Sequence, residues 1–348
     1  MVTGARTAYR TPRPAPAAVE APPHGAAGRN PGMPLDLGWV REIRVNRSAV
    51  ERRAATIPTR RTVKKAHQAG WLLRAITLMD LTTLMGDDTP GRVRRLCAKA
   101  RQPVRPDLLD ALGMQGVPLH VAAVCVYHVF VETAVEALRG SGIPVAAVST
   151  GFPAGLSPFP QRLAEIEASV AAGAEEIDIV ITRAHVLTGN WQALYDEVRA
   201  FRAASGSAHL KAILATGELG TLRDVARASA VAMMAGADFI KTSTGKEPVN
   251  ATLPVGLVMA RQIREYRMRT GHLVGLKPAG GIRTAKEAWH YLCMVKETLE
   301  GVDTHPGCHW LSPHLFRFGA STLANDLLRQ LQWLRTGVYP AGYDFAEA

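Results

Sequence analysis

Two lysines stand at the ends of short apolar segments and could act as nucleophiles. Lys241 follows Phe239 and Ile240, and Lys277 follows residues 273–276. A lysine that is partly buried at the end of a strand loses hydration, which lowers the pKa of its amine. A second ammonium group nearby disfavours charge on both lysines and lowers the pKa further. The free amine can attack a carbonyl and form an imine, which then assists cleavage of a neighbouring carbon–carbon bond. A single lysine at such a place could serve only in an ion pair, but two of them beside an acid favour catalysis.

Asp178 supplies that acid. It lies between Ile177 and Ile179, so in a strand the two isoleucines share one face and Asp178 occupies the other. A buried carboxylate is costly unless it is paired, so we expect one of the two lysines as its partner. Asp178 could then move protons during imine chemistry, or it could form a purely structural salt bridge.

Two turns indicate a phosphate site. Gly280 and Gly281 follow Lys277 and offer backbone N–H groups, and Ser321 and Thr322 open a predicted helix whose N-terminus favours anions. A further hydroxyl and ammonium group come from the segment after Lys241, at Thr244 and Lys246.

The elements that must position these residues follow a repeating pattern. A short apolar run, rich in Val, Ile, Leu and Ala, precedes a turn and then a longer amphipathic segment, as buried parallel strands and their helices require. We expect eight strands, at 75–79, 119–126, 145–149, 176–181, 209–215, 239–241, 273–277 and 315–319. Between them lie predicted helices, one of which begins at Thr89-Pro90 with a capping threonine and a proline in the first turn.

Eight such units predict an α/β protein with a (β/α)8 TIM barrel. The alternative is a doubly wound open sheet, but no G-x-G-x-x-G follows the first strand, and an even count of eight favours closure. Active sites of these barrels lie at the C-terminal ends of the strands. Polar or reactive residues gather there, including Asp80, Thr82 and Cys125, although Cys125 could equally be a buried structural cysteine.

Composition limits the class of protein and its surroundings. The chain has 348 residues, of which 47% are hydrophobic and 20% charged, and no apolar run is long enough to cross a bilayer. The four cysteines are scattered and match no zinc signature, which predicts a reducing compartment, the cytoplasm, and no metal. The net charge of +11 belongs to the front of the chain, since residues 1–74 hold 14 Lys and Arg against 4 Asp and Glu. The body is nearly neutral, so we do not expect a nucleic-acid partner.

The same shift in composition suggests four regions. We expect a disordered, basic Ala/Pro/Arg-rich tail over 1–34, a basic linker or helical strap over 35–74, the barrel over 75–335 and a C-terminal tail over 336–348. The N-terminal tail could be merely solvated, could be a targeting segment, or could contact an anionic partner.

At the residues that carry this chemistry the chain resembles a known family, deoxyribose-phosphate aldolase, a class I aldolase. The resemblance covers roughly residues 70–335 and rests on long motifs. These are D-L-T-T-L at 80–84, C-V-Y at 125–127, E-I-D-I at 176–179, T-G-E-L at 216–219 with Lys211, F-I-K-T-S-T-G-K at 239–246, V-N-A-T at 249–252, K-P-A-G-G-I-R-T-A at 277–285 and R-F-G-A-S at 317–321.

The resemblance implies a role for each matching residue. Lys241 would form the Schiff base, Lys277 would lower its pKa and assist proton transfer, and Asp178 would be the relay acid. Lys246, Gly280, Gly281 and Ser321 would hold the substrate phosphate. The implied reaction is reversible cleavage of 2-deoxy-D-ribose 5-phosphate to D-glyceraldehyde 3-phosphate and acetaldehyde, without a cofactor. Neither a membrane nor nucleic acid is implied, and a monomer or a homodimer would be compatible.

Three departures from the family pattern limit what can be carried over. His128 replaces the proline that commonly follows the C-V-Y motif, and Thr322 replaces a serine in the phosphate turn. A C-terminal tyrosine reaches the site in the family, but no motif decides between Tyr339 and Tyr343.

Overall fold

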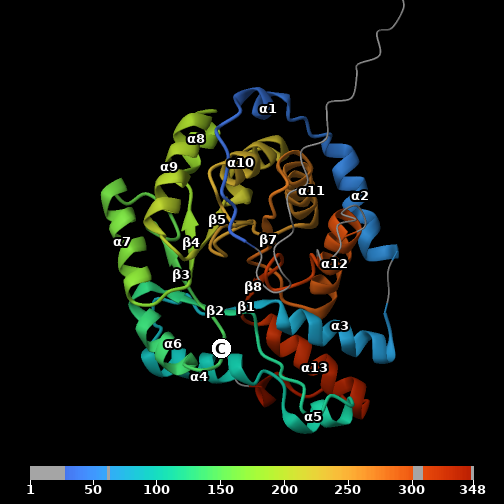
Figure 1. Ribbon diagram of the computed structural model, residues 1–348. Coiled ribbons are helices and arrows are strands. Elements are labelled where there is room, and N and C mark those ends of the chain that lie inside the picture. Colours follow the sequence, from blue (N-terminus) through green and yellow to red (C-terminus); the bar gives the residue numbers. More distant parts are fainter. Residues whose placement is uncertain (1–27, 61–62, 301–308, 346–348) are drawn as a thin grey trace, which may run out of the picture.

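Eight short parallel strands form the centre of the computed structural model, which describes residues 28–60, 63–300 and 309–345 (Figure 1). From β1 to β7 each strand pairs in parallel with the next along the chain, and β1 also pairs with β8. Bridges at Leu276–Phe316 and Ala279–Gly319 join β7 to the segment containing β8 and close the barrel. The strands are β1 (Met79–Thr82), β2 (Ala123–Tyr127), β3 (Val145–Ser149), β4 (Glu176–Val180), β5 (His209–Ile213), β6 (Phe239–Lys241), β7 (Gly275–Lys277) and β8 (Phe318–Ala320).

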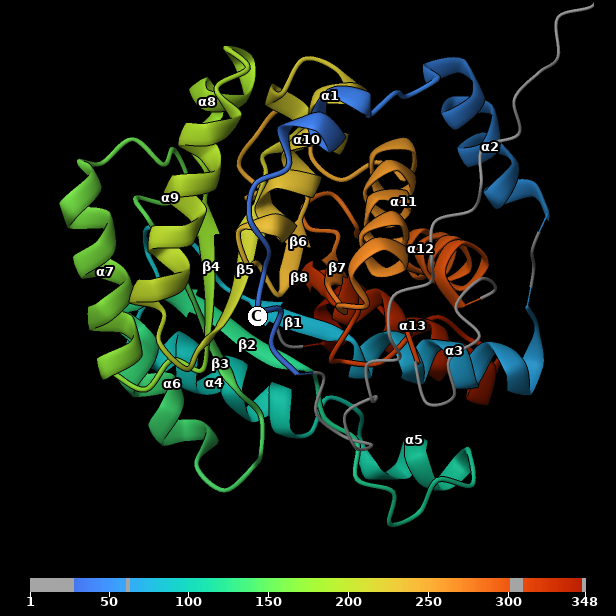
Figure 2. The same cartoon turned by 45° about the horizontal axis from the view of Figure 1, so that its top comes forward.

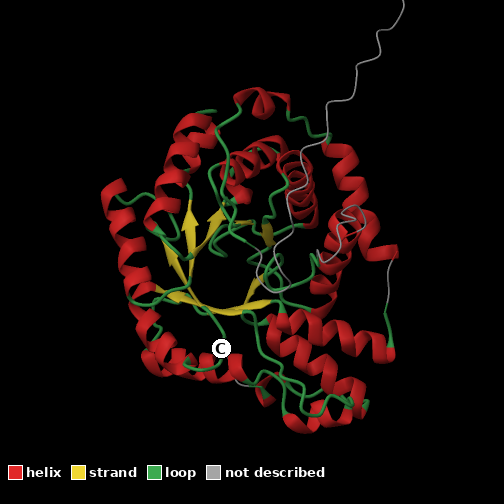
Figure 3. Ribbon diagram, in the orientation of Figure 1, coloured by secondary structure: helices red, strands yellow, loops and turns green. Residues whose placement is uncertain are grey.

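Helices surround this ring of strands (Figure 3). The prediction of a (β/α)8 TIM barrel is therefore confirmed, with one principal helix after each strand. In order these are α4 (Pro90–Arg101), α6 (Val131–Leu138), α7 (Phe159–Ala171), α9 (Trp191–Ala204), α10 (Leu222–Met234), α11 (Leu253–Thr270), α12 (Ala285–Val295) and α13 (Leu323–Thr336). Thr89 caps α4 by accepting a hydrogen bond from the Arg92 N–H, and Pro90 opens the helix, as expected.

Shorter elements lie at the strand ends and at the edges of the barrel. The additional helices are α5 (Pro106–Ala111) and α8 (Arg183–Leu187). The remaining turns are η1 (His128–Phe130), η2 (Thr216–Glu218), the π turn η3 (Lys296–Glu300) and η4 (Gly342–Asp344). No helix in the described part of the chain combines the length and the apolar character needed to cross a membrane.

The segment predicted as a linker or helical strap contains three helices packed on the outside of the barrel. They are α1 (Leu37–Glu42), α2 (Arg47–Arg60) and α3 (Lys65–Thr77). In both views α1 lies over α10, α2 lies along α11 and α12, and α3 lies beside α13 (Figures 1 and 2). Trp39, Val40, Val50 and Ile57 are buried in these contacts, so the strap extends the hydrophobic core.

The first strand begins later than predicted. The expected strand at 75–79 is wrong, because α3 continues to Thr77 and β1 starts at Met79. Leu72, Leu73 and Ile76 are all buried at helical spacing, and a short apolar run of this kind does not distinguish a buried helix from a strand.

The end of the predicted N-terminal tail is held against the barrel. Residues 1–27 lie outside the described residues, but 28–34 are described, and Asn30 is only 3% exposed. The Asn30 side-chain amide donates to the carbonyl oxygens of Met233 and Ala237 at 2.8 and 2.9 Å, and its backbone N–H donates to Asp238 at 2.8 Å. The Tyr266 hydroxyl donates to the Asn30 side-chain oxygen at 3.0 Å. Residues 28–34 therefore differ from the disordered tail that composition suggested. The side chain and backbone N–H of the buried Asn30 together form hydrogen bonds with four residues of the barrel.

Replacing Asn30 by alanine is expected to lower the free energy of unfolding by about 2–3 kcal/mol, because it leaves buried polar groups without partners. Urea unfolding followed by tryptophan fluorescence measures the change. Gln192→Ala, at an exposed residue that pairs only with Asp196 on its own helix, is the control and should change stability little. An Asn30→Ala chain as stable as this control would contradict the anchoring role.

Candidate active site

Lys241 and Lys277 lie side by side at the ends of β6 and β7. The two residues are register partners in the parallel pair, and their side chains are 3% and 0% exposed. Both ammonium groups contact the same carboxylate oxygen, Asp178 Oδ2, at 2.8 Å from Lys241 Nζ and 2.7 Å from Lys277 Nζ. The predicted pairing of Asp178 with a lysine is thus confirmed, and Asp178 contacts both candidates.

Asp178 also binds a third lysine that the sequence motifs contained but to which we assigned no role. Lys211, its register partner on β5, donates to Asp178 Oδ1 at 2.8 Å and to Glu176 Oε2 at 2.6 Å. Arg317, just before β8, donates to Glu176 Oε1 at 2.8 Å and to Asp80. Lys277 Nζ lies 2.5 Å from Asp80 Oδ2, so the series of ion pairs that begins at Asp178 leads back to Lys277.

These seven buried side chains form what we call the ionic cluster: Asp80, Glu176, Asp178, Lys211, Lys241, Lys277 and Arg317. Fully ionised, it would hold four cations and three anions. A net charge in a region without water is costly, so the loss of one proton from a cation is favoured. The electrostatics indicate which cation loses it.

The pKa values of the three central groups move in different directions. Burial would raise the pKa of Asp178, but the charges of Lys211, Lys241 and Lys277 outweigh it and hold this pKa well below its usual range. Burial would lower the pKa of Lys277, but Asp178 and Asp80 raise it above its ordinary value. For Lys241, burial lowers the pKa, Asp178 opposes the change and the charge of Lys277 adds to it, so this pKa stays lowered. Of the three amines that contact Asp178, Lys241 is therefore the one whose pKa is lowered, and a lowered amine pKa favours the uncharged form that a nucleophile requires.

Sequence reasoning missed Glu176, Lys211 and Arg317 as members of the site. A signal for two of them was present. Glu176 stands two residues before Asp178 in the same strand and so faces the same side, and Lys211 interrupts an otherwise apolar strand. A buried charge in such a strand requires a partner of opposite sign.

Asp80 and Thr82, predicted to bind substrate, lie in or beside the ionic cluster. Asp80 is fully buried, and burial would raise its pKa, but Arg317, Lys277 and Lys211 lower it below its ordinary value. The Thr82 hydroxyl donates to the backbone oxygen of Asp80 at 2.8 Å. Asp80 therefore holds Lys277 in place through their ion pair, and Thr82 holds the backbone of Asp80.

Cys125 lies on an apolar wall next to the lysines. It is fully buried and packs with Leu84, Ala146 and Val148, with Tyr127 and Phe152 against this group. Burial raises the pKa of its thiol, which therefore stays protonated and unreactive.

The loops predicted to hold phosphate come together at the ends of β7 and β8. Gly280 and Gly281 both have positive φ, at 78° and 81°, and the Gly280 N–H donates to the Gly319 oxygen at 3.4 Å. A Cβ at Gly319 would lie 2.7 Å from Ala279 Cβ and 3.2 Å from Lys277 Cε, so only glycine lets the loop approach Lys277 this closely. Ser321 and Thr322 follow directly, just before α13 begins at Leu323.

Thr244 and Lys246 follow Lys241 but make different contacts. The buried Thr244 hydroxyl donates to Glu247 Oε2 at 2.8 Å, and Glu247 also accepts from the backbone N–H groups of Thr244 and Gly245. Lys246 is exposed, and its ammonium lies 3.9 Å from the Met85 sulfur. Thr244 therefore shapes the loop, and Lys246 is available to an anion.

Arg183 connects the loops around the mouth of the barrel. Its guanidinium donates to the backbone oxygens of Ala154 and Pro153 after β3, and it pairs with Glu218 after β5 at 2.5 Å. It also lies 3.9 Å from Glu247, the residue that holds the Thr244 loop. One side chain after β4 thus joins three neighbouring loops.

The residues at which the sequence departs from the family pattern lie away from the ionic cluster. His128 is half exposed, with Nδ1 3.4 Å from Glu165. Tyr339 stacks on Trp333 and donates to Gln330, and Tyr343 is 91% exposed. Within the described range, neither tyrosine contacts Lys241 or Lys277.

Comparison with known proteins identifies the family. The model of the DeoC/LacD family aldolases matches residues 74–326, so the chain belongs to this family of aldolases, and the predicted resemblance is confirmed. The chain is 56% identical over 320 residues to deoxyribose-phosphate aldolase of Homo sapiens, covering 91% of this chain and 98% of that protein. It is 58% identical over 315 residues to the Mus musculus protein of the same name, covering 90% and 97%.

A solved structure supports the fold. The putative deoxyribose-phosphate aldolase from Toxoplasma gondii is similar with a TM-score of 0.64 at 21% identity, covering 78% of this chain and 96% of that one. At this identity the likeness concerns the barrel alone.

The opposing effects of Asp178 and Lys277 on Lys241 give a test by pH. Asp178→Asn removes a charge that raises the Lys241 pKa, so imine formation should begin at lower pH. Lys277→Met removes a charge that lowers it, so imine formation should begin at higher pH. The rate of trapping of acetaldehyde by cyanoborohydride, followed by intact mass across pH, measures both shifts. Shifts of the same sign in the two variants would refute this account.

Proposed function

We propose that the chain cleaves 2-deoxy-D-ribose 5-phosphate reversibly to D-glyceraldehyde 3-phosphate and acetaldehyde, through an imine on Lys241. The observation that carries the proposal is the lowered pKa of Lys241 beside Lys277 and Asp178, in a chain of an aldolase family. The names of the mammalian relatives support deoxyribose phosphate as the substrate.

The reaction begins at the free amine of Lys241. It attacks the aldehyde carbon of the open-chain sugar, and the carbinolamine loses water to give a protonated imine. Asp178, hydrogen-bonded to Lys241 and Lys277, is placed to relay the protons that these steps require. Its low pKa keeps it ionised at rest, and Lys277 is the nearest protonated donor.

Carbon–carbon cleavage follows from the imine. The hydroxyl on C3 loses its proton, the C2–C3 bond breaks, and the electron pair moves to the iminium nitrogen, which gives glyceraldehyde phosphate and an enamine. Protonation of the enamine at C2 and hydrolysis then release acetaldehyde and restore Lys241. The apolar wall around Cys125 protects the enamine from premature reaction with water.

We assign the phosphate end of the substrate to the loops after β6, β7 and β8. The backbone N–H group of Gly281, the hydroxyls of Ser321 and Thr322, and the exposed ammonium of Lys246 provide donors of the type that phosphate requires. For Gly280 we propose that it shapes this turn, since its own N–H donates to the Gly319 oxygen. For Thr244, Asp80 and Thr82 we propose a supporting role, because their polar side-chain groups are engaged within the protein.

The cellular compartment and the oligomeric state of the protein are also proposals. The buried cysteines Cys97 and Cys125 support a reducing compartment, the cytoplasm. Mass measurement in solution would decide between a monomer and a homodimer.

Trapping with borohydride tests the mechanism. Incubation with deoxyribose 5-phosphate and borohydride should add a mass to the tryptic peptide that contains Lys241, and Lys241→Leu should abolish the adduct. Lys286→Leu, at an exposed lysine on α12, is the matched control and should keep it. An adduct on another lysine would refute the assignment, and cleavage of only keto-sugar phosphates would refute the substrate.

Lys277→Leu is expected to lower turnover by about two orders of magnitude or more, because it removes both a proton donor and the cation beside Lys241. Circular dichroism serves as the control for folding. Full activity of a folded Lys277→Leu chain would contradict its role in proton transfer.

A further inference from the structure

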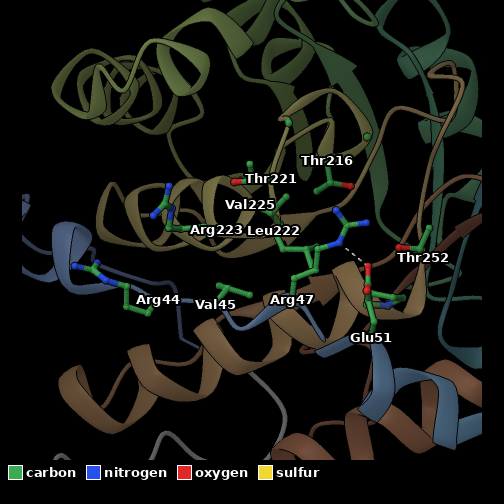
Figure 4. Close-up of a pocket in the computed structure, with 13 residues that line it drawn as sticks. Arg44, Val45, Arg47, Glu51, Thr216, Thr221, Leu222, Arg223, Val225 and Thr252 are labelled. Atoms are coloured by element: carbon green, nitrogen blue, oxygen red, sulfur yellow. Dashed lines mark hydrogen bonds and ion pairs between the residues drawn. The ribbon is translucent and has the colours of Figure 1, made fainter. Parts of the chain in front are cut away.

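A cavity of about 530 Å³ lies between the N-terminal strap and the loop after β5, away from the ionic cluster (Figure 4). The start of α2 forms one side, and η2 with the first turns of α10 and α11 forms the other. None of the seven residues of the ionic cluster lines it. Its polar lining includes the hydroxyls of Thr216, Thr221 and Thr252 and the arginines Arg44, Arg47 and Arg223.

The charge of this cavity is strongly positive. Arg44 and Arg223 form no ion pair with a carboxylate within the residues that the structure describes, and Arg47 pairs with Glu51 at 2.7 Å. Figure 4 shows the Arg47 side chain reaching toward the middle of the cavity, while Arg44 and Arg223 lie together at its left. A fourth cation stands close by, since burial and the charges of Arg223 and Arg44 all lower the pKa of Arg227. The three arginines that line the cavity outnumber its one lining carboxylate, Glu51, and this surplus of positive charge attracts an anion.

A second observation indicates a ligand. Thr216 is only 6% exposed, it lines the cavity, and its hydroxyl has no hydrogen-bond partner among the described residues. Buried hydroxyls without a partner are rare because their desolvation is not compensated. The hydroxyl oxygen itself is covered, so a turn of this side chain toward the cavity would let a bound acceptor oxygen provide the missing partner.

The cavity also has an apolar wall. Val45, Leu222, Val225 and Pro254 line it next to the arginines. A bare inorganic anion would leave this wall uncovered, whereas a phosphate ester with an organic body would cover it. The volume lies within the range of cavities that hold small organic ligands.

We propose that this cavity binds a phosphorylated small molecule of about nucleotide size, with its phosphoryl group on Arg47 and Thr216 and its organic body on the apolar wall, where it extends to Arg223. Guanidinium groups bind phosphoryl oxygens through paired, charge-assisted hydrogen bonds. The cavity is lined by none of the residues assigned to the substrate phosphate site, which are Lys246, Gly280, Gly281, Ser321 and Thr322.

The position of the cavity links such a ligand to the catalytic strand. The Thr216 N–H donates to the Thr242 oxygen at 2.9 Å, and the Leu214 N–H donates to the Lys241 oxygen at 2.9 Å. A ligand bridging Arg47 and Thr216 would join the strap to the backbone that carries Lys241. This gives the basic N-terminal strap a specific task at the barrel.

Isothermal titration of the full chain with AMP, adenosine and inorganic phosphate tests the proposal. AMP should bind, adenosine should not, and inorganic phosphate should bind more weakly than AMP. Arg47→Ala, Arg223→Ala and Thr216→Val should each weaken AMP binding, the Arg47 variant by about tenfold or more, because it removes a charge-assisted contact. Arg52→Ala, at an exposed arginine of the same helix outside the cavity, is the matched control and should bind as the unchanged chain does.

Lys246→Ala separates this site from the substrate phosphate site, and binding is read without any aldolase assay. AMP binding that persists in Lys246→Ala and weakens in Arg47→Ala supports the proposal. Loss of binding in Lys246→Ala with retention in both arginine variants would place the ligand in the substrate site and overturn it. Absence of AMP binding at millimolar concentration would also overturn it. Equal binding of phosphate and AMP would refute the assignment of the apolar wall.

Discussion

The carboxylate of Asp178 is the group on which the rest of the site depends. It is fully buried, and it accepts hydrogen bonds from three ammonium groups, those of Lys211, Lys241 and Lys277. Without this anion, three cations would stand together in a region from which water is excluded, and such an arrangement is strongly unfavourable. With it, two lysines remain charged while the third has a lowered pKa. One buried ion thus separates otherwise similar amines into two whose pKa is raised and one whose pKa is lowered.

The closed parallel barrel makes this arrangement possible. Strands that run in the same direction deliver their C-terminal ends to one face, so residues far apart in the sequence become register partners, as Lys241 and Lys277 are. Alternation along each strand then directs one set of side chains inward. The charge balance extends to Glu176 and Arg317 deeper in the barrel, and every charged group in the ionic cluster has a partner of opposite sign.

The sequence alone was sufficient to predict the barrel and the proximity of Lys241, Lys277 and Asp178, because both predictions depend on local patterns. Apolar runs alternating with helical segments predicted the strands, and a lysine at the end of such a run indicated Lys241 and Lys277. The acid between two isoleucines within a strand indicated Asp178. The additional partners Lys211, Glu176 and Arg317 belonged to recognised motifs, but their contacts depend on register across strands, which a single sequence does not specify. Thr244 was expected to bind substrate, but in the structure its hydroxyl donates to Glu247, three residues later. The sequence does not show whether this hydroxyl bonds to a neighbouring side chain or to a ligand. The start of β1 was misplaced because the same apolar residues satisfy a helix.

The docking of the N-terminal segment also constrains the order in which the chain can fold during synthesis. Asn30 precedes its partners Met233, Ala237 and Tyr266 by 203, 207 and 236 positions, so it is synthesised well before any of them. Trp39 and Val40, buried in the finished protein, have no complete surface to cover them until α10 and α11 have been made. Since domains fold as units while the chain grows, the apolar residues of the strap stay exposed through most of translation. The strap therefore presents an exposed apolar surface to chaperones on the nascent chain, and its docking is completed only after α10 and α11 have been made.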